Sequence, residues 1–158
     1  WQLAIEAEKP SILALSRQNL PALRTEIVEG NPSSKGAYVI AGGKDADAVI
    51  FATGSEVAIA VSSLDLLSQQ GISGKVVSVP SMELFFAQSQ EYRDSVIGKP
   101  KAKVAIEAGI EMSWLKLLGD RGRFVGMHSF GASAPAEKLY EHFGITANAI
   151  VEAVMAQL

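Results

Sequence analysis

The sequence predicts an α/β fold of three layers, in which helices cover both faces of a mostly parallel, five-stranded mixed sheet. Two observations predict it. From residue 37 onward, short apolar runs of strand length alternate with amphipathic stretches of helix length. Turn residues such as Gly71 and Pro80 separate these runs. Strands that alternate with helices are typical of parallel sheets with helices on both faces.

Five apolar runs are expected to form the sheet. The run at 48–52, Ala-Val-Ile-Phe-Ala, contains no polar residue and is typical of a buried strand. Gly42 and Gly43 end the first run, and Pro80 breaks the third. The expected strands cover residues 37–40, 48–52, 75–79, 103–106 and 124–126.

A helix is expected over 56–70, because apolar residues recur there at helical spacing. Ser55 is favoured as its N-cap, Glu56 compensates the helix dipole, and Gly71 supplies a left-handed stop. Further helices are expected near the N-terminus at 2–7, at about 88–96, at 112–118 and from Pro135 to about 143. The last helix is capped by Thr146, and its apolar side holds Ile150, Val151, Val154 and Leu158.

Composition narrows the possible functions. The 158 residues suit one domain with a remnant of another, and a net charge of −3 without charged blocks argues against a nucleic-acid partner. Cysteine is absent, which excludes disulfides and thiolate chemistry. No apolar stretch reaches the ~20 residues that span a bilayer, so no membrane association is expected. Because the chain opens on Trp1 without a helix start signal, we expect a fragment of a longer protein.

An apolar run at 12–15 predicts another buried strand, and Arg17 follows it directly. Ligands of open α/β sheets bind beyond the carboxyl ends of the strands, where a guanidinium suits a phosphate or carboxylate. From position alone, a salt bridge to a loop or a cap on a helix end is the favoured role. The polar stretch at 19–35, rich in proline, glycine and serine, is expected to be a linker.

Other candidate residues also have structural interpretations. The turn Thr53-Gly54-Ser55 opens a helix, as phosphate-binding turns do, but it lacks their glycine motifs and Glu56 adds a negative charge. Glu107 ends a strand and could act as a general acid or base, cap a helix, or pair with a lysine of a neighbouring subunit. The structural roles are favoured for both.

The remaining polar residues do not predict a catalytic centre. His128 and His142 lack the spacing of metal ligands. Ser133 is not in a nucleophile-elbow motif and is interpreted as a helix cap before Pro135.

Six short sequence motifs, in the same order along the chain, resemble the C-terminal part of a transketolase. They are LSRQ at 15–18, ATGSEV at 52–57, VSVPS at 77–81, YRDSV at 92–96, EAG at 107–109 and FGASAP at 130–135. The chain departs from the family at Val79, Gly98 and the pair His128-Ser129. None of these departures affects Arg17, which matches the arginine that binds the phosphate end of the sugar-phosphate substrate in this family.

The resemblance implies a cytoplasmic, homodimeric enzyme that depends on thiamine diphosphate and a divalent cation, Mg²⁺ or Ca²⁺. Such an enzyme transfers a two-carbon ketol unit from a ketose phosphate to an aldose phosphate. Residues 1–18 would be the tail of the pyrimidine-binding middle domain, 19–35 the linker and 36–158 the C-terminal domain. This chain would bind no cofactor or metal, would be inactive alone, and would supply Arg17 and dimer contacts.

Two alternatives remain open at this point. The chain could end another thiamine-diphosphate enzyme, such as a dihydroxyacetone synthase, a deoxyxylulose-phosphate synthase or a ketoacid dehydrogenase β-subunit. It could instead be a regulatory or interaction module that binds a nucleotide at 53–56, or a partner protein.

Overall fold

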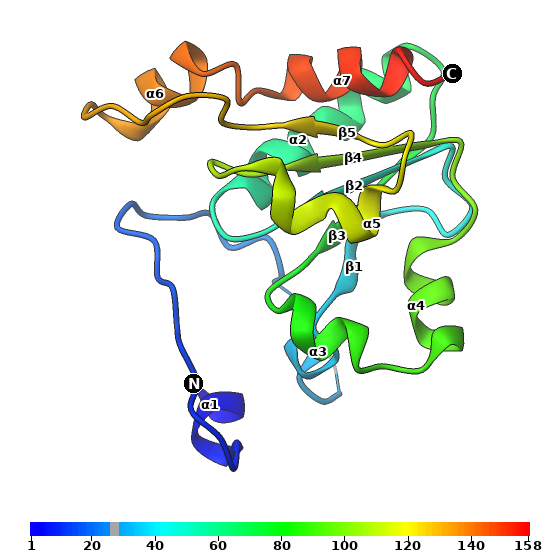
Figure 1. Cartoon of the computed structure of the whole chain (residues 1–158). Helices are drawn as coiled ribbons and strands as arrows, with labels where there is room; N and C mark the ends of the chain where they lie inside the picture. The colour runs from blue at the N-terminus through cyan, green and yellow to red at the C-terminus, as the bar shows by residue number, and fades with distance from the viewer. Residues whose placement is uncertain (26–28) are drawn as a thin grey trace.

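The computed structural model describes residues 1–25 and 29–158, and a five-stranded sheet forms its centre (Figure 1). The strands are β1 (Tyr38–Gly42), β2 (Ala48–Ala52), β3 (Gly74–Ser78), β4 (Ala102–Ile106) and β5 (Arg123–Val125). Their order is β1-β3-β2-β4-β5, with β1 antiparallel to β3 and the other pairs parallel. The predicted α/β fold with a mixed sheet is confirmed.

β2 lies at the centre of the sheet, and all five of its residues are buried. Ala48, Ile50 and Ala52 belong to one core cluster, whereas Val49 and Phe51 belong to a second. Successive side chains of a strand point to opposite faces, so the two clusters lie on opposite sides of the sheet. A central strand that is apolar at every position therefore requires a cover on each face.

Helices provide the two covers. On one face, α2 (Glu56–Gln69) packs against α7 (Ala147–Met155) over the first cluster. On the other face, residues of α3 (Met82–Phe86), α4 (Gln90–Ile97), η2 (Glu111–Trp114) and α5 (Leu115–Leu118) form the second cluster. α6 (Ala136–His142) precedes α7 in the first layer (Figure 1). Four of the five helices predicted after residue 55 thus occur within two residues of their expected bounds, whereas the last ends at Met155 and does not reach Leu158.

Side-chain caps set several helix starts. Thr146 Oγ1 accepts the amide of Ala149 at 3.2 Å, which confirms its predicted capping of α7. Ser81 caps α3 in the same way, through the amide of Leu84 at 3.3 Å. The sequence did not predict α3, because five residues are too few to show a helical period.

The predicted strand at 12–15 is wrong. Residues 11–16 have no regular secondary structure, and Ile12 is 97% exposed. A strand needs a neighbour to satisfy its amides and carbonyls, and no described strand pairs with this run.

Two expectations at helix ends are also wrong. Ser133 does not cap α6, since Pro135 occupies the N-cap position and no side chain bonds the first helical amides. Leu158 lies beyond the end of α7 and is exposed, so only Ile150, Val151 and Val154 of the expected apolar side contact the core.

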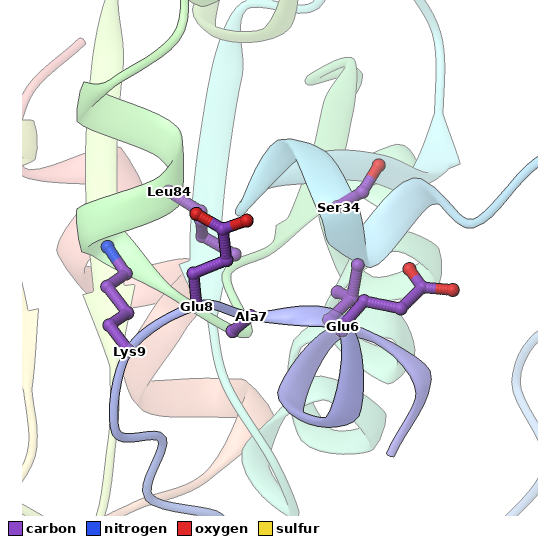
Figure 2. A pocket seen from close by; sticks show the side chains of 7 residues that line it. Glu6, Ala7, Glu8, Lys9, Ser34 and Leu84 are labelled. Atoms are coloured by element: carbon purple, nitrogen blue, oxygen red, sulfur yellow. The ribbon is translucent and has the colours of Figure 1, made fainter.

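The segment at 1–25 lies outside the sheet (Figure 1). It begins with α1 (Gln2–Glu6), as predicted, and α1 faces η1 (Pro32–Lys35) across an open crevice of about 470 Å³. Figure 2 shows that Ala7 and Glu8 line this crevice together with Ser34 of η1 and Leu84 of α3. Of the predicted linker at 19–35, residues 26–28 lie outside the described residues.

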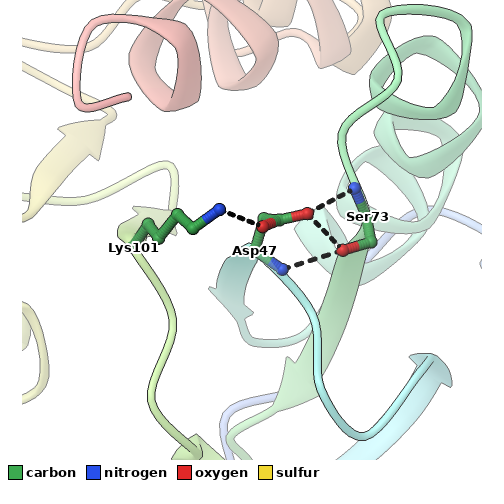
Figure 3. Close-up of polar contacts among 3 residues, drawn as sticks. All are labelled: Asp47, Ser73 and Lys101. Atoms are coloured by element: carbon green, nitrogen blue, oxygen red, sulfur yellow. Dashed lines mark hydrogen bonds and ion pairs between the residues drawn. The ribbon is translucent and has the colours of Figure 1, made fainter.

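Three loops are tied together at the amino edge of the sheet (Figure 3). Asp47 precedes β2, Ser73 precedes β3 and Lys101 precedes β4. The Asp47 carboxylate accepts hydrogen bonds from Lys101 Nζ at 2.8 Å and from the Ser73 amide at 3.2 Å, while the Asp47 amide donates to Ser73 Oγ at 2.9 Å. The hydrogen bond from Lys101, the two hydrogen bonds from Ser73 and the positive charge of Lys101 hold the pKa of Asp47 well below its usual range.

Replacing Asp47 should therefore lower the free energy of unfolding by an amount that depends on pH. A carboxyl with a depressed folded pKa stabilises the fold above the unfolded pKa of about 3.9, and this contribution is lost as the pH falls through the folded pKa. In urea unfolding, Asp47→Asn should be less stable than the parent at pH 7, with the difference shrinking below about pH 4. Asp120→Asn, at an exposed loop position, is the control and should change little. A difference for Asp47→Asn that is constant with pH would contradict this account.

Gly36 joins η1 to β1 in a conformation that other residues rarely adopt. Its φ is +79°, and its carbonyl accepts the amide of Ser81 at 3.0 Å. A Cβ at this position would collide with the Phe85 amide nitrogen and the Ser81 carbonyl, both of them backbone atoms. The start of β1 therefore lies against the start of α3 only because residue 36 has no side chain.

Gly36→Ala should lower the free energy of unfolding by about 2–5 kcal/mol, the combined cost of the left-handed backbone and the collision. Gly43→Ala is the matched control, since a Cβ there meets nothing within 4 Å and the backbone needs no positive φ. That control should change stability by less than about 0.5 kcal/mol. Chemical denaturation of both variants measures the difference, and equal stabilities would refute the packing argument.

Candidate functional site

The carboxyl ends of β2, β3, β4 and β5 meet at one edge of the sheet, where ligands of such folds bind. β2 runs into the turn that opens α2, and β4 ends directly before Glu107. β1 starts at this same edge, because Tyr38 pairs with Ser78 at the end of β3. The sequence-predicted site residues can therefore be judged by what they contact here.

The turn after β2 carries its own negative charge. Ser55 occupies the N-cap position of α2, as predicted, but its hydroxyl donates to Glu56 Oε1 at 3.1 Å and bonds no helix amide. Glu56 lies in the first turn of α2 and is only 5% exposed. A carboxylate at this place is stabilised by the positive end of the helix dipole.

Tyr140 of α6 completes the surroundings of this carboxylate. Its hydroxyl donates to Glu56 Oε1 at 2.7 Å, so one carboxylate oxygen accepts from two hydroxyls. Burial is the main reason that the pKa of Tyr140 lies above that of a free phenol; the hydrogen bond and charge of Glu56 also raise this pKa, whereas the contacts with Ser55 and Gln18 lower it in part. Tyr140 therefore remains protonated, and its O–H remains a donor, at neutral pH.

The segment that carries Arg17 reaches this cluster. Gln18 Nε2 donates to the hydroxyl of Tyr140 at 3.4 Å. Further along, Leu23 packs against the first core cluster and the Arg24 guanidinium lies 6.0 Å from the centre of the Tyr38 ring. Residues 18–24 thus run along the carboxyl edge, from α6 towards β1.

Arg17 itself is exposed. Within the described residues, no hydrogen bond or ion pair involves its guanidinium, so neither the salt bridge nor the helix cap considered from the sequence occurs there. A guanidinium offers five donors in a planar fork, which matches two oxygens of a phosphate or carboxylate.

An apolar pocket of about 230 Å³ lies beside Tyr140. α6 contributes Leu139 and Tyr140, and the loop at 130–135 contributes Gly131 and Ala132. The phenol is the one hydrogen-bonding side chain in its lining, because the other residues are apolar or glycine. This pocket does not suit an anion.

Glu107 has a structural role in this chain. Its Oε2 accepts the indole N–H of Trp114 at 2.7 Å, and that indole is buried. It caps no helix here, since Ile110 is the N-cap of η2. The carboxylate therefore fixes the end of η2, at Trp114, beside the end of β4.

No metal or diphosphate site is found in the described part of the chain. Among residues 1–25 and 29–158, no group of three His, Cys, Asp or Glu side chains is arranged to hold a metal, so His128 and His142 belong to no such group. The turn at 53–56 does not fit a diphosphate, because the Glu56 carboxylate occupies the start of α2. Across the same described ranges, no helix is long and apolar enough to cross a membrane.

Sequence reasoning missed the contacts of Gln18, Glu56 and Tyr140. Tyr140 is 84 residues from Glu56 and 122 residues from Gln18. No local spacing signals such contacts. The only available signal was that all three residues belong to, or adjoin, segments that meet at the carboxyl edge.

Comparison with known proteins assigns the family. A model described as "Transketolase-like TK C-terminal domain" matches residues 36–146. Transketolase of Rhodobacter capsulatus is 50% identical over an alignment that covers all of this chain and 25% of that protein. The chloroplastic transketolase of Solanum tuberosum is 44% identical, over 94% of this chain and 20% of that protein.

Solved structures agree with the sequence comparison. The structure of Pichia stipitis transketolase in complex with sedoheptulose-7-phosphate has a TM-score of 0.87 and 37% identity, over 99% of this chain and 22% of that one. The chain thus spans about a quarter of the length of the curated relatives it matches. Because the domain model covers more than half of the chain and the relatives align with nearly all of it, this chain belongs to the transketolase family and contains its C-terminal domain.

Proposed function

We propose that this chain is the C-terminal part of a homodimeric transketolase, which transfers a two-carbon ketol unit from a ketose phosphate to an aldose phosphate. The observation that carries the proposal is the alignment of the whole chain with a transketolase at 50% identity. Residues 1–18 are assigned to the tail of the pyrimidine-binding middle domain, 19–35 to a linker and 36–158 to the C-terminal domain.

Within this enzyme, Arg17 binds the phosphate of the sugar. Three observations support this role. Arg17 adjoins Gln18, which contacts Tyr140 at the ligand-binding edge of the sheet. Its guanidinium is exposed, and no described side chain forms an ion pair with it. Its planar donors match phosphate oxygens.

The chain's own residues hold and orient; they do not transfer protons or carbon units. Thiamine diphosphate and a divalent cation, Mg²⁺ or Ca²⁺, would supply carbanion stabilisation from the preceding domains.

The apolar side chains of Ile110, Met112 and Leu115 are exposed, which supports the proposal that another domain or the second subunit covers this face. A cytoplasmic location is part of the proposal, although several relatives are named as chloroplastic.

The alternative of a nucleotide-binding module receives no support from the turn at 53–56. A nucleotide phosphate at the start of α2 would meet the Glu56 carboxylate, which already accepts two hydroxyl hydrogen bonds. Repulsion between these two negative groups disfavours such binding.

Replacing Arg17 should selectively impair phosphorylated substrates. In the full-length enzyme, Arg17→Ala should lower kcat/KM for sugar phosphates by about ten- to a hundredfold, because losing a charged hydrogen bond costs ~1.5–3 kcal/mol. Unphosphorylated donor or acceptor substrates should be affected little. Steady-state kinetics with both substrate types measures the selectivity.

Arg121→Ala is the matched control for this experiment. Arg121 is also exposed but precedes β5, at the opposite edge of the sheet. This variant should leave both substrate types unchanged. Equal losses for both types in Arg17→Ala would refute the phosphate role.

The chain alone should be inactive. Incubated with thiamine diphosphate, Mg²⁺ and a pair of sugar phosphates, it should form no ketol-transfer product above the blank, because residues 1–25 and 29–158 provide no diphosphate or metal site. The full-length enzyme in the same assay is the positive control. Turnover that rises in proportion to the concentration of the chain would overturn this expectation.

A further inference from the structure

Glu56 is one of two charged side chains that are buried among the described residues; the other, Lys75, lies near the amino edge. Burying a carboxylate is costly unless it is fully hydrogen-bonded. An exposed glutamate in the first turn would interact with the helix dipole at a lower cost. The burial of Glu56 therefore calls for a role beyond the stability of α2.

The hydrogen bonds around Glu56 give Tyr140 one orientation. An ionised carboxylate only accepts, so the phenol must point its single proton at Glu56 Oε1, 2.7 Å away. The oxygen lone pairs of Tyr140 then remain as acceptors. Gln18 Nε2 donates to this oxygen from 3.4 Å, and the direction of each bond follows from the carboxylate.

Gln18 is the neighbour of Arg17 in the sequence. Among the described residues, its amide makes the one side-chain hydrogen bond that connects residues 10–25 to the rest of the domain. The next anchors along the segment are Leu23 and Arg24. Without the bond to Tyr140, the backbone at residue 17 would lack a fixed point on the carboxyl edge.

We propose that Tyr140, oriented by Glu56, is a positioning residue for Arg17 and acts through Gln18. This inference rests on the proposed role of Arg17 in phosphate binding. Tyr140 does not touch the substrate in this account, because its proton is bound to Glu56 and its oxygen to Gln18. Its contribution is to hold the Arg17 guanidinium at the phosphate-binding position, so that the Arg17 segment loses less conformational entropy when the sugar phosphate binds.

The test uses Tyr140→Phe in the full-length enzyme, which removes the hydroxyl and keeps the ring. KM for sugar phosphates should rise about three- to tenfold, the effect of one neutral hydrogen bond, while kcat and the constants for unphosphorylated substrates stay unchanged. Tyr92→Phe is the matched control. That hydroxyl is also partly buried and donates at 2.9 Å, but to the carbonyl of Ala37 on the other face of the domain. It should leave KM for both substrate types unchanged.

Two further variants separate positioning from general stability. Gln18→Leu, at an exposed site, should reproduce the rise in KM without affecting folding, and combining it with Tyr140→Phe should add nothing. Glu56→Gln keeps an acceptor for the phenol and should give a smaller rise than Tyr140→Phe. Thermal unfolding of each variant verifies that the enzyme is folded.

The outcomes distinguish this inference from the proposed function. One outcome is that Arg17→Ala lowers kcat/KM for sugar phosphates selectively while Tyr140→Phe and Gln18→Leu leave KM for sugar phosphates unchanged. That outcome overturns the positioning role of Tyr140 and leaves the proposed function of Arg17 intact. Equal losses for both substrate types in Tyr140→Phe show a structural role only and also overturn it. An Arg17→Ala variant without phosphate selectivity overturns the proposed function and this inference together. In the Arg17→Ala background, Tyr140→Phe should have no further effect on KM.

Discussion

The burial of β2 on both faces is the constraint on which the rest of this structure depends. Its five apolar residues contribute to both core clusters, and a fully buried Ile or Phe side chain contributes about 1.5–3 kcal/mol. Helices cover both faces in this chain, and parallel neighbours of the central strand supply them, because parallel strands are joined by crossover connections that place helices on the faces of the sheet. Because the strands on either side of β2 are parallel to it, all three end at one edge.

The two edges of the sheet have different chemistry as a result. At the amino edge, Asp47 links the loops before β2, β3 and β4 by bonds that use both of its carboxylate oxygens. At the carboxyl edge, Glu56 links α2 to α6 and, through Tyr140, to the segment at 18–24. The hydrogen bonds of Asp47 connect only the loops of the sheet to one another. Those of Glu56 and Tyr140 reach a segment outside the sheet, and this difference makes the carboxyl edge the place where the domain can influence a ligand site.

The spacing of apolar residues predicted those strands and helices whose residues show that spacing within a single segment of the sequence. The strand at 48–52 was evident from its unbroken apolar run, and the helix from 56 was evident because its apolar residues recur at helical spacing. The run at 12–15 has the same composition as a strand but no described neighbour to pair with, so composition alone misled. Ser55 was placed correctly, yet its hydroxyl bonds Glu56, because a buried carboxylate beside it competes with the helix amides. The contacts of Tyr140 depend on how α6 packs, which no local pattern determines.

The same carboxylate explains why this domain resembles phosphate-binding folds without binding phosphate in their manner. A turn at a strand end that opens a helix normally offers its amides and the positive helix end to an anion. Here Glu56 supplies the anion from within the chain, held by the hydroxyls of Ser55 and Tyr140. The usual anion site of the fold is therefore filled by its own side chain. The phosphate role proposed for Arg17 would place that function on a group outside the sheet, one residue from the hydrogen bond that connects its segment to this internal anion.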